Sequence, residues 1–414
     1  MTFKFTSVAA LLLLCATAQA QDALRASLAG EQSAESRKRE RLARGEAGYN
    51  LDLDPVKLRL SSSISGEYND NVNLDSTNRM DDFILRPTTS INAYWQITEL
   101  NALDLTFDLG YEYYFNGSRD SRPVVTGNQN SGLYFDIYVG DFLISLHDKF
   151  ALSQDSSSEA TGSGIANIYR FENDAGVTVT WDLQNTILDF NYDHQDYVPL
   201  DSIYDYLKHS SELASIRLSE ILNPAFTVGV VVGAGSTSYS DSRLSNNHHI
   251  SIGPFVSYHP NEDFEVRANF GYTEYWYDAS GTITNDSSQT GFYADLALTQ
   301  RFSPRTSHTL LISQSLSSDI NSVPLEMLTV RYSPDLRIIE NWTLQPYVVF
   351  ESGNESLDTT PEEFTRWGAG MIATRQITEK LFGSLGYHWL TKSSNIAGYE
   401  YDQNRLVLNL SYQF

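Results

Sequence analysis

Cysteine is almost absent from this chain, which has one, Cys15, among 414 residues. That residue lies in the opening segment MTFKFTSVAALLLLCATAQAQ, where Lys4 precedes an apolar run and a small-x-small site, AQA, ends at Ala20. The pattern predicts a secretory signal peptide over residues 1–20. Lipidation of Cys15 is the alternative, but it requires a small side chain where the chain has Leu14. A mature chain without thiols excludes disulfides and cysteine-ligated metals.

Long hydrophobic runs are also missing. After the opening segment no apolar stretch approaches the roughly 18 to 20 residues that a membrane-spanning helix requires, so helical insertion is excluded. No Pro-, Gly- or Ser-rich linker divides the chain into separate domains. No glycine-rich phosphate loop follows a strand, and no His, Cys and Asp cluster has metal-ligand spacing. The sequence therefore predicts neither a cofactor nor a metal.

Basic residues are scarce as well. Lysine and arginine number 28 against 52 aspartates and glutamates, which gives a formal net charge of −24. This balance argues against nucleic acid as a partner, because phosphate binding needs a basic surface. Aromatic residues, in contrast, are abundant, with 25 tyrosines and 20 phenylalanines.

The dominant pattern in the chain is a period of two. In LDLTFDLGYEYYF, residues 103–115, the odd positions carry only Leu, Phe and Tyr, and the even positions up to Glu112 carry Asp, Thr, Gly or Glu. Successive side chains of a strand point to opposite faces, so this segment has one apolar and one acidic face. The same period recurs in residues 133–139, 264–272, 342–350 and 405–414.

Connections between such segments alternate in length. Short turns are expected at residues 98–101, 182–185, 303–306 and 378–380, and longer polar loops are expected at residues 116–132, from Ser153 and from Ser352. Short periplasmic turns and long extracellular loops are typical of outer-membrane barrels. The sequence therefore predicts an all-β fold, a transmembrane antiparallel up-and-down β-barrel of about 18 strands, with 16 as the alternative, in the bacterial outer membrane.

The predicted organisation has three parts. Residues 1–20 are the cleaved signal peptide, residues 21–56 are a periplasmic N-terminal tail, disordered or partly helical, and residues 57–414 are the barrel. The tail is rich in charges of both signs, and its few leucines make no sustained apolar stripe. A small plug or a partner-binding helix is the alternative for this tail.

A soluble β-sandwich or a β-propeller would also contain many alternating strands. The apolar faces of a sandwich meet in two packed layers, and a propeller repeats a blade-length motif; neither feature is present. Trp95, Trp181 and Trp342 lie beside predicted short turns, whereas Trp276, Trp367 and Trp389 lie toward the long loops. Two such groups are expected for the aromatic girdles at the two membrane interfaces, which favours the barrel.

The last residues, LVLNLSYQF, alternate apolar and polar side chains up to a terminal aromatic residue. A closed barrel pairs its last strand with its first, so these apolar side chains would face lipid. The ending resembles the C-terminal signal of bacterial outer-membrane proteins, and the resemblance implies recognition by the barrel-assembly machinery. The matching residues are Leu408, Leu410, Tyr412 and Phe414.

Acidic residues of the polar parity define the predicted lining of the lumen. They are Asp104, Asp108, Glu112, Asp136, Asp189 and Asp295. A lumen lined by carboxylates enriches cations and disfavours anions, so small cationic solutes are the expected cargo. Outer-membrane lipid and lipopolysaccharide are the expected surroundings. The sequence contains no pattern that sets an oligomeric state.

Histidine adjoins an acidic or hydroxyl residue, or another histidine, at several places. These pairs are His147–Asp148, Asp193–His194, His209–Ser210 and His248–His249. Because adjacent residues in a strand point to opposite faces, the members of a pair cannot cooperate directly. Only assembly across strands could build a catalytic site, and no other pattern supports one. The chain is therefore not expected to be an enzyme.

Two features fit the barrel less well. Pro87, Pro254 and Pro346 fall inside predicted strands, where a missing N–H interrupts the ladder, and β-bulges are the expected accommodation. Alternation is also weak at residues 200–225 and 317–340, which is the reason for the alternative count of about 16 strands.

One stretch of the chain resembles a known family. In SISGEYNDNVNL and NRMDDFILRPTTSINAYW the matching positions are Tyr68, Asp70, Asn71, Val72, Asp82, Phe83, Ile84 and Pro87. They resemble the opening of the β-barrel porin 2 family of bacterial outer-membrane proteins. Some members are associated with exopolysaccharide production, so the resemblance implies a role linked to polysaccharide. It also implies that a proline inside a strand is tolerated in this fold.

Two functions from different classes follow. The first is a porin-like diffusion channel with an acidic, cation-preferring lumen, because barrels of about 16 to 18 strands leave an aqueous channel. The second is a non-conducting outer-membrane scaffold or surface barrel that serves exopolysaccharide production, export or adhesion.

Overall fold

Long β-strands follow one another along most of the chain. The computed structural model describes residues 49–126, 132–154, 168–279, 287–356 and 361–414. The strands are β1 (Leu51–Leu53), β2 (Val56–Asn69), β3 (Asp82–Gln96), β4 (Ala102–Tyr114), β5 (Arg122–Thr126), β6 (Gly132–Val139), β7 (Phe142–Ser153), β8 (Arg170–Asp182), β9 (Thr186–Pro199), β10 (His209–Asn223), β11 (Phe226–Tyr239), β12 (Asn247–Asn261), β13 (Phe264–Tyr277), β14 (Ser287–Ser303), β15 (Thr306–Ser318), β16 (Pro324–Ile339), β17 (Trp342–Glu355), β18 (Glu363–Gln376), β19 (Leu381–Ser394) and β20 (Tyr401–Gln413). A short 3-10 helix, η2 (Ser202–Leu207), lies between β9 and β10. Among the described residues, no helix is long and apolar enough to cross a membrane.

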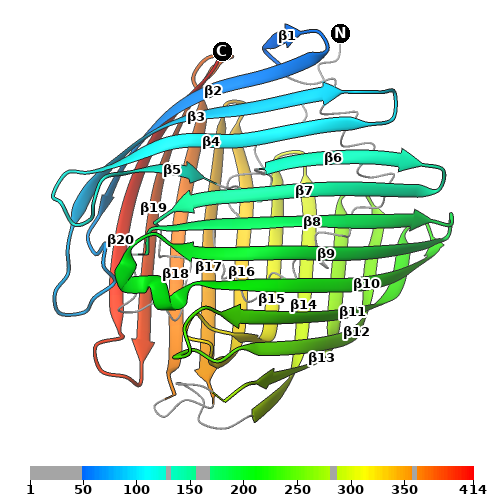
Figure 1. Cartoon of the computed structure of the whole chain (residues 1–414). Helices are drawn as coiled ribbons and strands as arrows, with labels where there is room; N and C mark the ends of the chain where they lie inside the picture. Colours follow the sequence, from blue (N-terminus) through cyan, green and yellow to red (C-terminus); the bar gives the residue numbers. More distant parts are fainter. Residues whose placement is uncertain (1–48, 127–131, 155–167, 280–286, 357–360) are drawn as a thin grey trace.

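The strands form one antiparallel sheet that closes on itself. β20 pairs with β2, from Gln413 opposite Ser61 to Arg405 opposite Asn69, and in Figure 1 the C-terminal end of β20 lies beside β2. β5 pairs with the C-terminal half of β4 and β6 with its N-terminal half, so β5 and β6 share one position in the wall. β1 only extends the start of β2 as a hairpin. The result is a closed 18-strand antiparallel barrel, which confirms the predicted fold and strand count.

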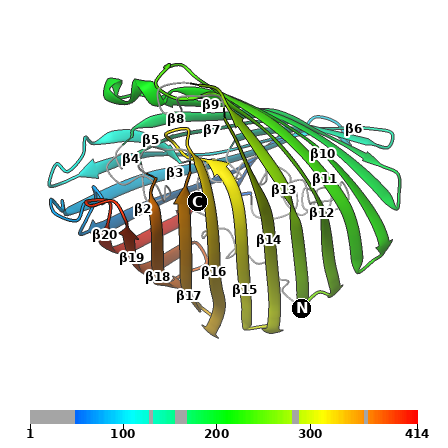
Figure 2. The same ribbon diagram turned by 90° about the horizontal axis from the view of Figure 1, so that it is seen from below.

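Burial alternates along the wall with a period of two. In β10, Ser211, Leu213, Ser215, Arg217 and Ser219 are buried, and the residues between them are exposed. Figure 2 shows the strands as a continuous wall, so the buried parity faces inward and the exposed parity outward. The exposed set includes many large apolar side chains, among them Leu109, Ile216, Phe270, Val348 and Leu408. Exposed apolar side chains on this scale are expected where lipid covers the outer face.

Connections are short at one end of the barrel and longer at the other. Only Gly140 and Asp141 separate β6 from β7, whereas residues 200–208, with η2, join β9 to β10 and residues 240–246 join β11 to β12. The four predicted short turns all lie at the short end, as expected. In barrels of this kind the short turns are periplasmic and the longer loops extracellular, and the two ends are named accordingly below.

The tryptophans form the two predicted groups. Trp95, Trp181 and Trp342 lie at the periplasmic ends of β3, β8 and β17, and Trp276, Trp367 and Trp389 lie in the extracellular halves of β13, β18 and β19. Among the described outward positions, Trp95, Trp276 and Trp367 are about two-fifths to one-half exposed. Tryptophan on the outer face at two levels matches the aromatic girdles of a membrane barrel.

The boundaries differ from the predicted ones in three places, one of which is the loop expected from Ser352, because β17 continues to Glu355. The barrel was expected to start at residue 57, but β2 starts at Val56 and β1, inside the predicted tail, pairs with it. Tyr49 packs against Arg59 and Tyr94, both on the inner face, so the chain lies inside the wall there. The rest of the tail, residues 21–48, and the signal peptide lie outside the described residues. The predicted loop at residues 116–132 contains β5, which continues the sheet.

Prolines interrupt the ladder without the bulges that were expected. Pro87 lies in a gap between two paired stretches of β3 and β4, and Pro254 lies in a similar gap between β12 and β13. The residues skipped are equal in number on both strands, so the register is unchanged. Pro346 lies in the corresponding gap between β16 and β17. The bulge prediction was wrong because an unpaired stretch on one side already removes the need for the missing N–H.

Candidate functional site: the inner wall

The inner face of β4 carries three of the predicted lining residues. Leu109 and Tyr113 are exposed on the outer face, so Asp104, Asp108 and Glu112 of the opposite parity face inward. Asp136 on β6, Asp189 on β9 and Asp295 on β14 also lie on the inward parity of their strands. The six residues therefore occupy the same face of the wall, although they are spread over four wall positions.

Hydroxyl and amide groups of the wall bind several of these carboxylates. Ser145 Oγ donates to Asp136 Oδ1 at 2.5 Å, and Thr180 Oγ1 donates to Asp189 Oδ1 at 2.5 Å. Ser313 Oγ donates to Asp295 Oδ1 at 2.5 Å. Each donor lies on the strand next to its acceptor, because side chains opposite one another on one face of a sheet are neighbours. These bonds orient the carboxylates on the wall.

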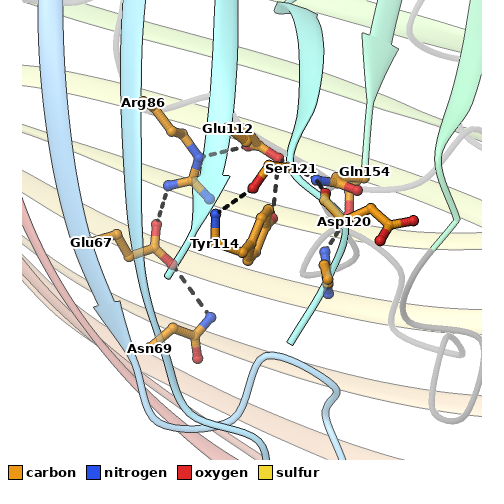
Figure 3. Close-up of polar contacts among 9 residues, drawn as sticks. Glu67, Asn69, Arg86, Glu112, Tyr114, Asp120, Ser121 and Gln154 are labelled. Carbon is orange, nitrogen blue, oxygen red and sulfur yellow. Dashed lines mark hydrogen bonds and ion pairs between the residues drawn. The ribbon is translucent and has the colours of Figure 1, made fainter. Parts of the chain in front are cut away.

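Glu112 is in a different environment, near the extracellular end of β4. Arg86 Nε lies 2.6 Å from Glu112 Oε1, and Arg86 Nη1 lies 2.6 Å from Glu67 Oε2 on β2. Figure 3 shows the guanidinium between the two carboxylates. Tyr114 Oη and Gln154 Nε2 donate to the second oxygen of Glu112, at 3.1 and 3.0 Å. Glu112 is thus part of a structural ion cluster rather than a simple lining charge.

Two more ion pairs lie buried near the extracellular end. Arg366 on β18 contacts Glu351 on β17, and Lys392 Nζ on β19 lies 2.7 Å from Glu362 Oε1. All four side chains are at most 4% exposed. A buried carboxylate is costly unless a cation and hydrogen bonds accompany it, so these pairs need both partners. They hold β17, β18 and β19 together beneath the loops.

A cluster that the sequence did not reveal crosses β7, β8 and β9. His147 Nε2 lies 2.8 Å from Asp193 Oδ1 and 3.8 Å from Asp174 Oδ1. Lys149 Nζ lies 3.0 Å from the other oxygen of Asp174. Gly176 lies between His147 and Asp193 in the same cross-strand row. The absence of a side chain there allows the imidazole to reach across the middle strand.

The neighbouring histidine and aspartate residues of the sequence point to opposite faces of the wall, as expected. His147 faces inward, whereas Asp148 faces outward and accepts a 2.6 Å bond from Asn173 Nδ2. Asp193 faces inward, whereas His194 faces outward, 2.8 Å from Glu212. Adjacent residues therefore do not cooperate, but residues on neighbouring strands do. Only knowledge of the register could have identified the inward set.

A basic counterpart crosses β16 to β20. Tyr347 Oη and His388 Nδ1 lie 2.7 Å apart, across Gly370 of the middle strand. Arg331 lies over the Tyr347 ring at 4.8 Å, and Arg405 is directly opposite His388. Among the described residues, no carboxylate forms an ion pair with Arg331 or Arg405. This part of the inner wall is cationic, although the chain is strongly acidic.

Extracellular loops pack on one another at one side of the mouth. Leu207 after β9, Leu244 after β11 and Ile168 before β8 form a buried cluster with Tyr197, and Ile320 packs against it. In the same region, burial raises the pKa of Asp319 well above its usual value, and the Glu355 carboxylate raises it further. On the rim, a hydrogen bond from Arg243 lowers the pKa of Asp241.

The predicted assembly residues lie on the outer face. Leu408, Leu410, Tyr412 and Phe414 are all exposed, and the Phe414 N–H donates to Leu60 O on β2 at 3.2 Å. Phe414 is therefore bound to the first wall strand. Its recognition by the assembly machinery stays a prediction.

Solved structures of three Pseudomonas aeruginosa proteins have the same fold. OccK1 (OpdK) superposes with a TM-score of 0.51 at 10% identity, over 86% of this chain and 99% of that one. OccK2 (OpdF), solved in complex with glucuronate, gives 0.51 at 11% identity, over 89% and 100%. OccK5 (OpdH) gives 0.51 at 12% identity, over 89% and 100%. This is the fold of an outer-membrane porin.

At these identities the likeness shows the fold alone. A scan against protein-family models found no match, and a search of curated proteins found none either. The closed barrel and its exposed apolar face make the outer membrane the compartment of this chain, as predicted. The expectation that the chain is not an enzyme agrees with a porin fold.

Proposed function

We propose that this protein is a porin-like diffusion channel whose acidic inner face favours cations. The observation that supports it most is the closed 18-strand wall with apolar side chains outside and carboxylates inside. Barrels of this size leave an aqueous lumen in porins. Acidic side chains on a narrow aqueous wall raise the local concentration of cations.

Five of the six predicted lining residues support this preference directly. Asp104, Asp108, Asp136, Asp189 and Asp295 lie on the inner face, on β4, β6, β9 and β14. Glu112 does not belong with them, because Arg86 lies between it and Glu67 and balances part of their charge. We therefore assign the selectivity to the aspartates and the role of Glu112 to holding β2, β3 and β4 together.

The alternative is a non-conducting scaffold or surface barrel linked to exopolysaccharide production, export or adhesion. One structural observation favours it: the loops around Leu207, Leu244 and Ile320 pack together instead of standing apart. The resemblance to the β-barrel porin 2 family, carried by residues around Tyr68 and Phe83, stays a proposal of the same kind. So do the signal peptide and contact with lipopolysaccharide.

Single-channel recording of the purified protein in a planar bilayer separates the two functions. A channel gives discrete current steps on insertion, whereas a scaffold leaves the bilayer silent. Folding is checked on the same preparation by the shift in gel mobility on heating. Silence from protein that is folded by this criterion would overturn the channel proposal.

A further inference from the structure

The cluster of His147, Asp174 and Asp193 has the composition of a metal site. One atom of each residue, the imidazole nitrogen and two carboxylate oxygens, lies within 4.8 Å of the others. The three residues come from three adjacent strands, so a rigid sheet sets their spacing. Ligands on rigid strands are held more accurately than ligands on loops.

Two of the candidate ligand atoms are buried and make no hydrogen bond. Within the described residues these are His147 Nε2 and Asp174 Oδ1. Asp193 Oδ1 is 2.8 Å from Nε2, but outside the direction of a ring N–H bond. Both atoms lie at ion-pair distance from other members of the cluster, but neither makes a well-directed hydrogen bond. A buried polar atom whose hydrogen bond is missing is costly, so an ion between these atoms would stabilise both.

Gly176 allows two of the candidate ligands to approach each other over the middle strand. A Cβ atom on this residue would lie 2.2 Å from Asp193 Oδ1 and 2.8 Å from His147 Cε1. Any other residue would therefore displace the two ligands. The glycine allows a nitrogen and an oxygen from non-adjacent strands to converge over the middle strand.

Lys149 completes the arrangement from outside the ligand set. Its ammonium lies 3.0 Å from Asp174 Oδ2, which leaves Oδ1 directed to the cluster. Outer contacts of this kind orient a ligating carboxylate. Metal binding requires a neutral imidazole. In that state the two carboxylates and one ammonium give the site a net negative charge, which a divalent cation would reverse.

We propose that His147, Asp174 and Asp193 bind one divalent transition-metal ion of the Zn²⁺ type on the inner wall. One imidazole and two carboxylates suit Zn²⁺ better than Ca²⁺ or Mg²⁺, which prefer all-oxygen sites. Three protein ligands leave a coordination position for water. The binding site does not depend on whether the barrel conducts.

Binding of Zn²⁺ alone to the purified full-length protein, measured by titration calorimetry, tests the proposal. We expect one saturable site in the wild type. In His147→Gln and in Asp193→Asn the affinity for Zn²⁺ should fall by a factor of about ten or more. The matched controls are His194→Gln and Asp148→Asn, which change the same residue types one position away on the outer face. These should keep wild-type affinity, and gel mobility on heating should show that all four variants fold.

Each result bears on the proposal. No saturable binding to the folded wild type would overturn it, as would equal losses in His147→Gln and His194→Gln. If only the outer-face variants lost affinity for Zn²⁺, the ion would lie at His194 and Glu212, and this would also overturn the proposal. Zn²⁺ binding by a barrel that passes no current would support this site while ending the channel proposal.

Discussion

Two parts of the inner wall use the same backbone arrangement and carry opposite charge. At β8, Gly176 allows His147 to reach Asp193, and at β18, Gly370 allows Tyr347 to reach His388. The first has two aspartates, and the second has Arg331 and Arg405.

The two patches lie on opposite sides of the barrel. β8 and β18 are eight strand positions apart in one direction around the wall and ten in the other, and Figures 1 and 2 show them on facing walls. Both glycines lie near the middle of their strands. The comparison shows that a net charge of −24 conceals a local basic surface. Across a lumen, such surfaces act on a passing ion from opposite sides.

The largest effect should come from charges placed on the wrong face beside each patch. Leu146→Lys and Leu406→Lys, next to His147 and Arg405 but outward, should cost about 2 to 4 kcal/mol near the bilayer midplane. Val407→Lys, which faces inward, is the control and should assemble normally. The measurement is the yield of heat-modifiable barrel in the outer-membrane fraction. If both outward variants assembled normally and the control failed, the inner and outer faces would have been assigned the wrong way round.

Replacing the two glycines should give a smaller loss. In Gly176→Ala the new Cβ would lie 2.6 Å from Tyr192 O, and in Gly370→Ala it would lie 2.7 Å from Tyr387 O. Crowding against backbone costs about 1 to 3 kcal/mol, and should lower the urea midpoint of the folded barrel. In Gly233→Ala, at another inward glycine, the new Cβ would meet the movable Ser251 hydroxyl at 2.8 Å and backbone only at 4.0 Å, at Ala214 O, so this change should be nearly neutral. Three equal midpoints would show that the glycines are not required for close approach.

Selectivity should change in opposite directions on the acidic and basic sides. Neutralising Asp104 and Asp108 to Asn should move the reversal potential in a salt gradient toward zero. Neutralising Arg331 and Arg405 to Gln should move it further in the cation-selective direction, because positive charge is removed from the wall. Shifts of the same sign in both double variants would mean that these four side chains do not act on permeating ions through their charge.

The smallest changes are single-cysteine substitutions, which test which end of the barrel is extracellular. The only native cysteine is Cys15, so single cysteines can be labelled selectively. Gly398→Cys between β19 and β20 and Gly140→Cys between β6 and β7 place a Cβ that meets nothing within 4 Å. Because both glycines have positive φ, 90° and 59°, each change should cost about 1 kcal/mol and leave the barrel folded. A membrane-impermeant maleimide on intact cells should label residue 398 and not residue 140. The reverse pattern would invert the orientation.

Much of the wall could be predicted because the alternation of apolar and polar residues is visible within the sequence of each single strand. The alternation around Leu109 and Glu112 assigned both faces of β4 correctly, and the predicted short turns all lie at the end of the barrel with the short connections. Where alternation was weak, as in β10 and β16, the cause is now visible. Inward Leu213 and Met327 are apolar, and outward Glu212 is polar near the extracellular end. A barrel tolerates both, because its inner face is partly packed and its rim is wet.

The site could be predicted less completely because its contacts depend on register. The position of Glu112 on the inner face followed from parity, but its pairing with Arg86 required the neighbouring strand and Gln154. The meeting of His147 and Asp193 required both the register of three strands and the glycine between them. The spacing of residues along the sequence shows neither this register nor which glycine lies between the two side chains. The prediction of β-bulges at the prolines was also wrong, because the hydrogen-bond ladder has a gap around Pro254 and no bulge there.

The most direct test of the account is the reversal potential of single wild-type barrels in a potassium chloride gradient across a planar bilayer. The account predicts discrete current steps and a potential of the sign set by potassium, since carboxylates of Asp104, Asp108 and Asp189 lie on the inner face. Steps with a potential set by chloride, or no steps from folded protein, would contradict it.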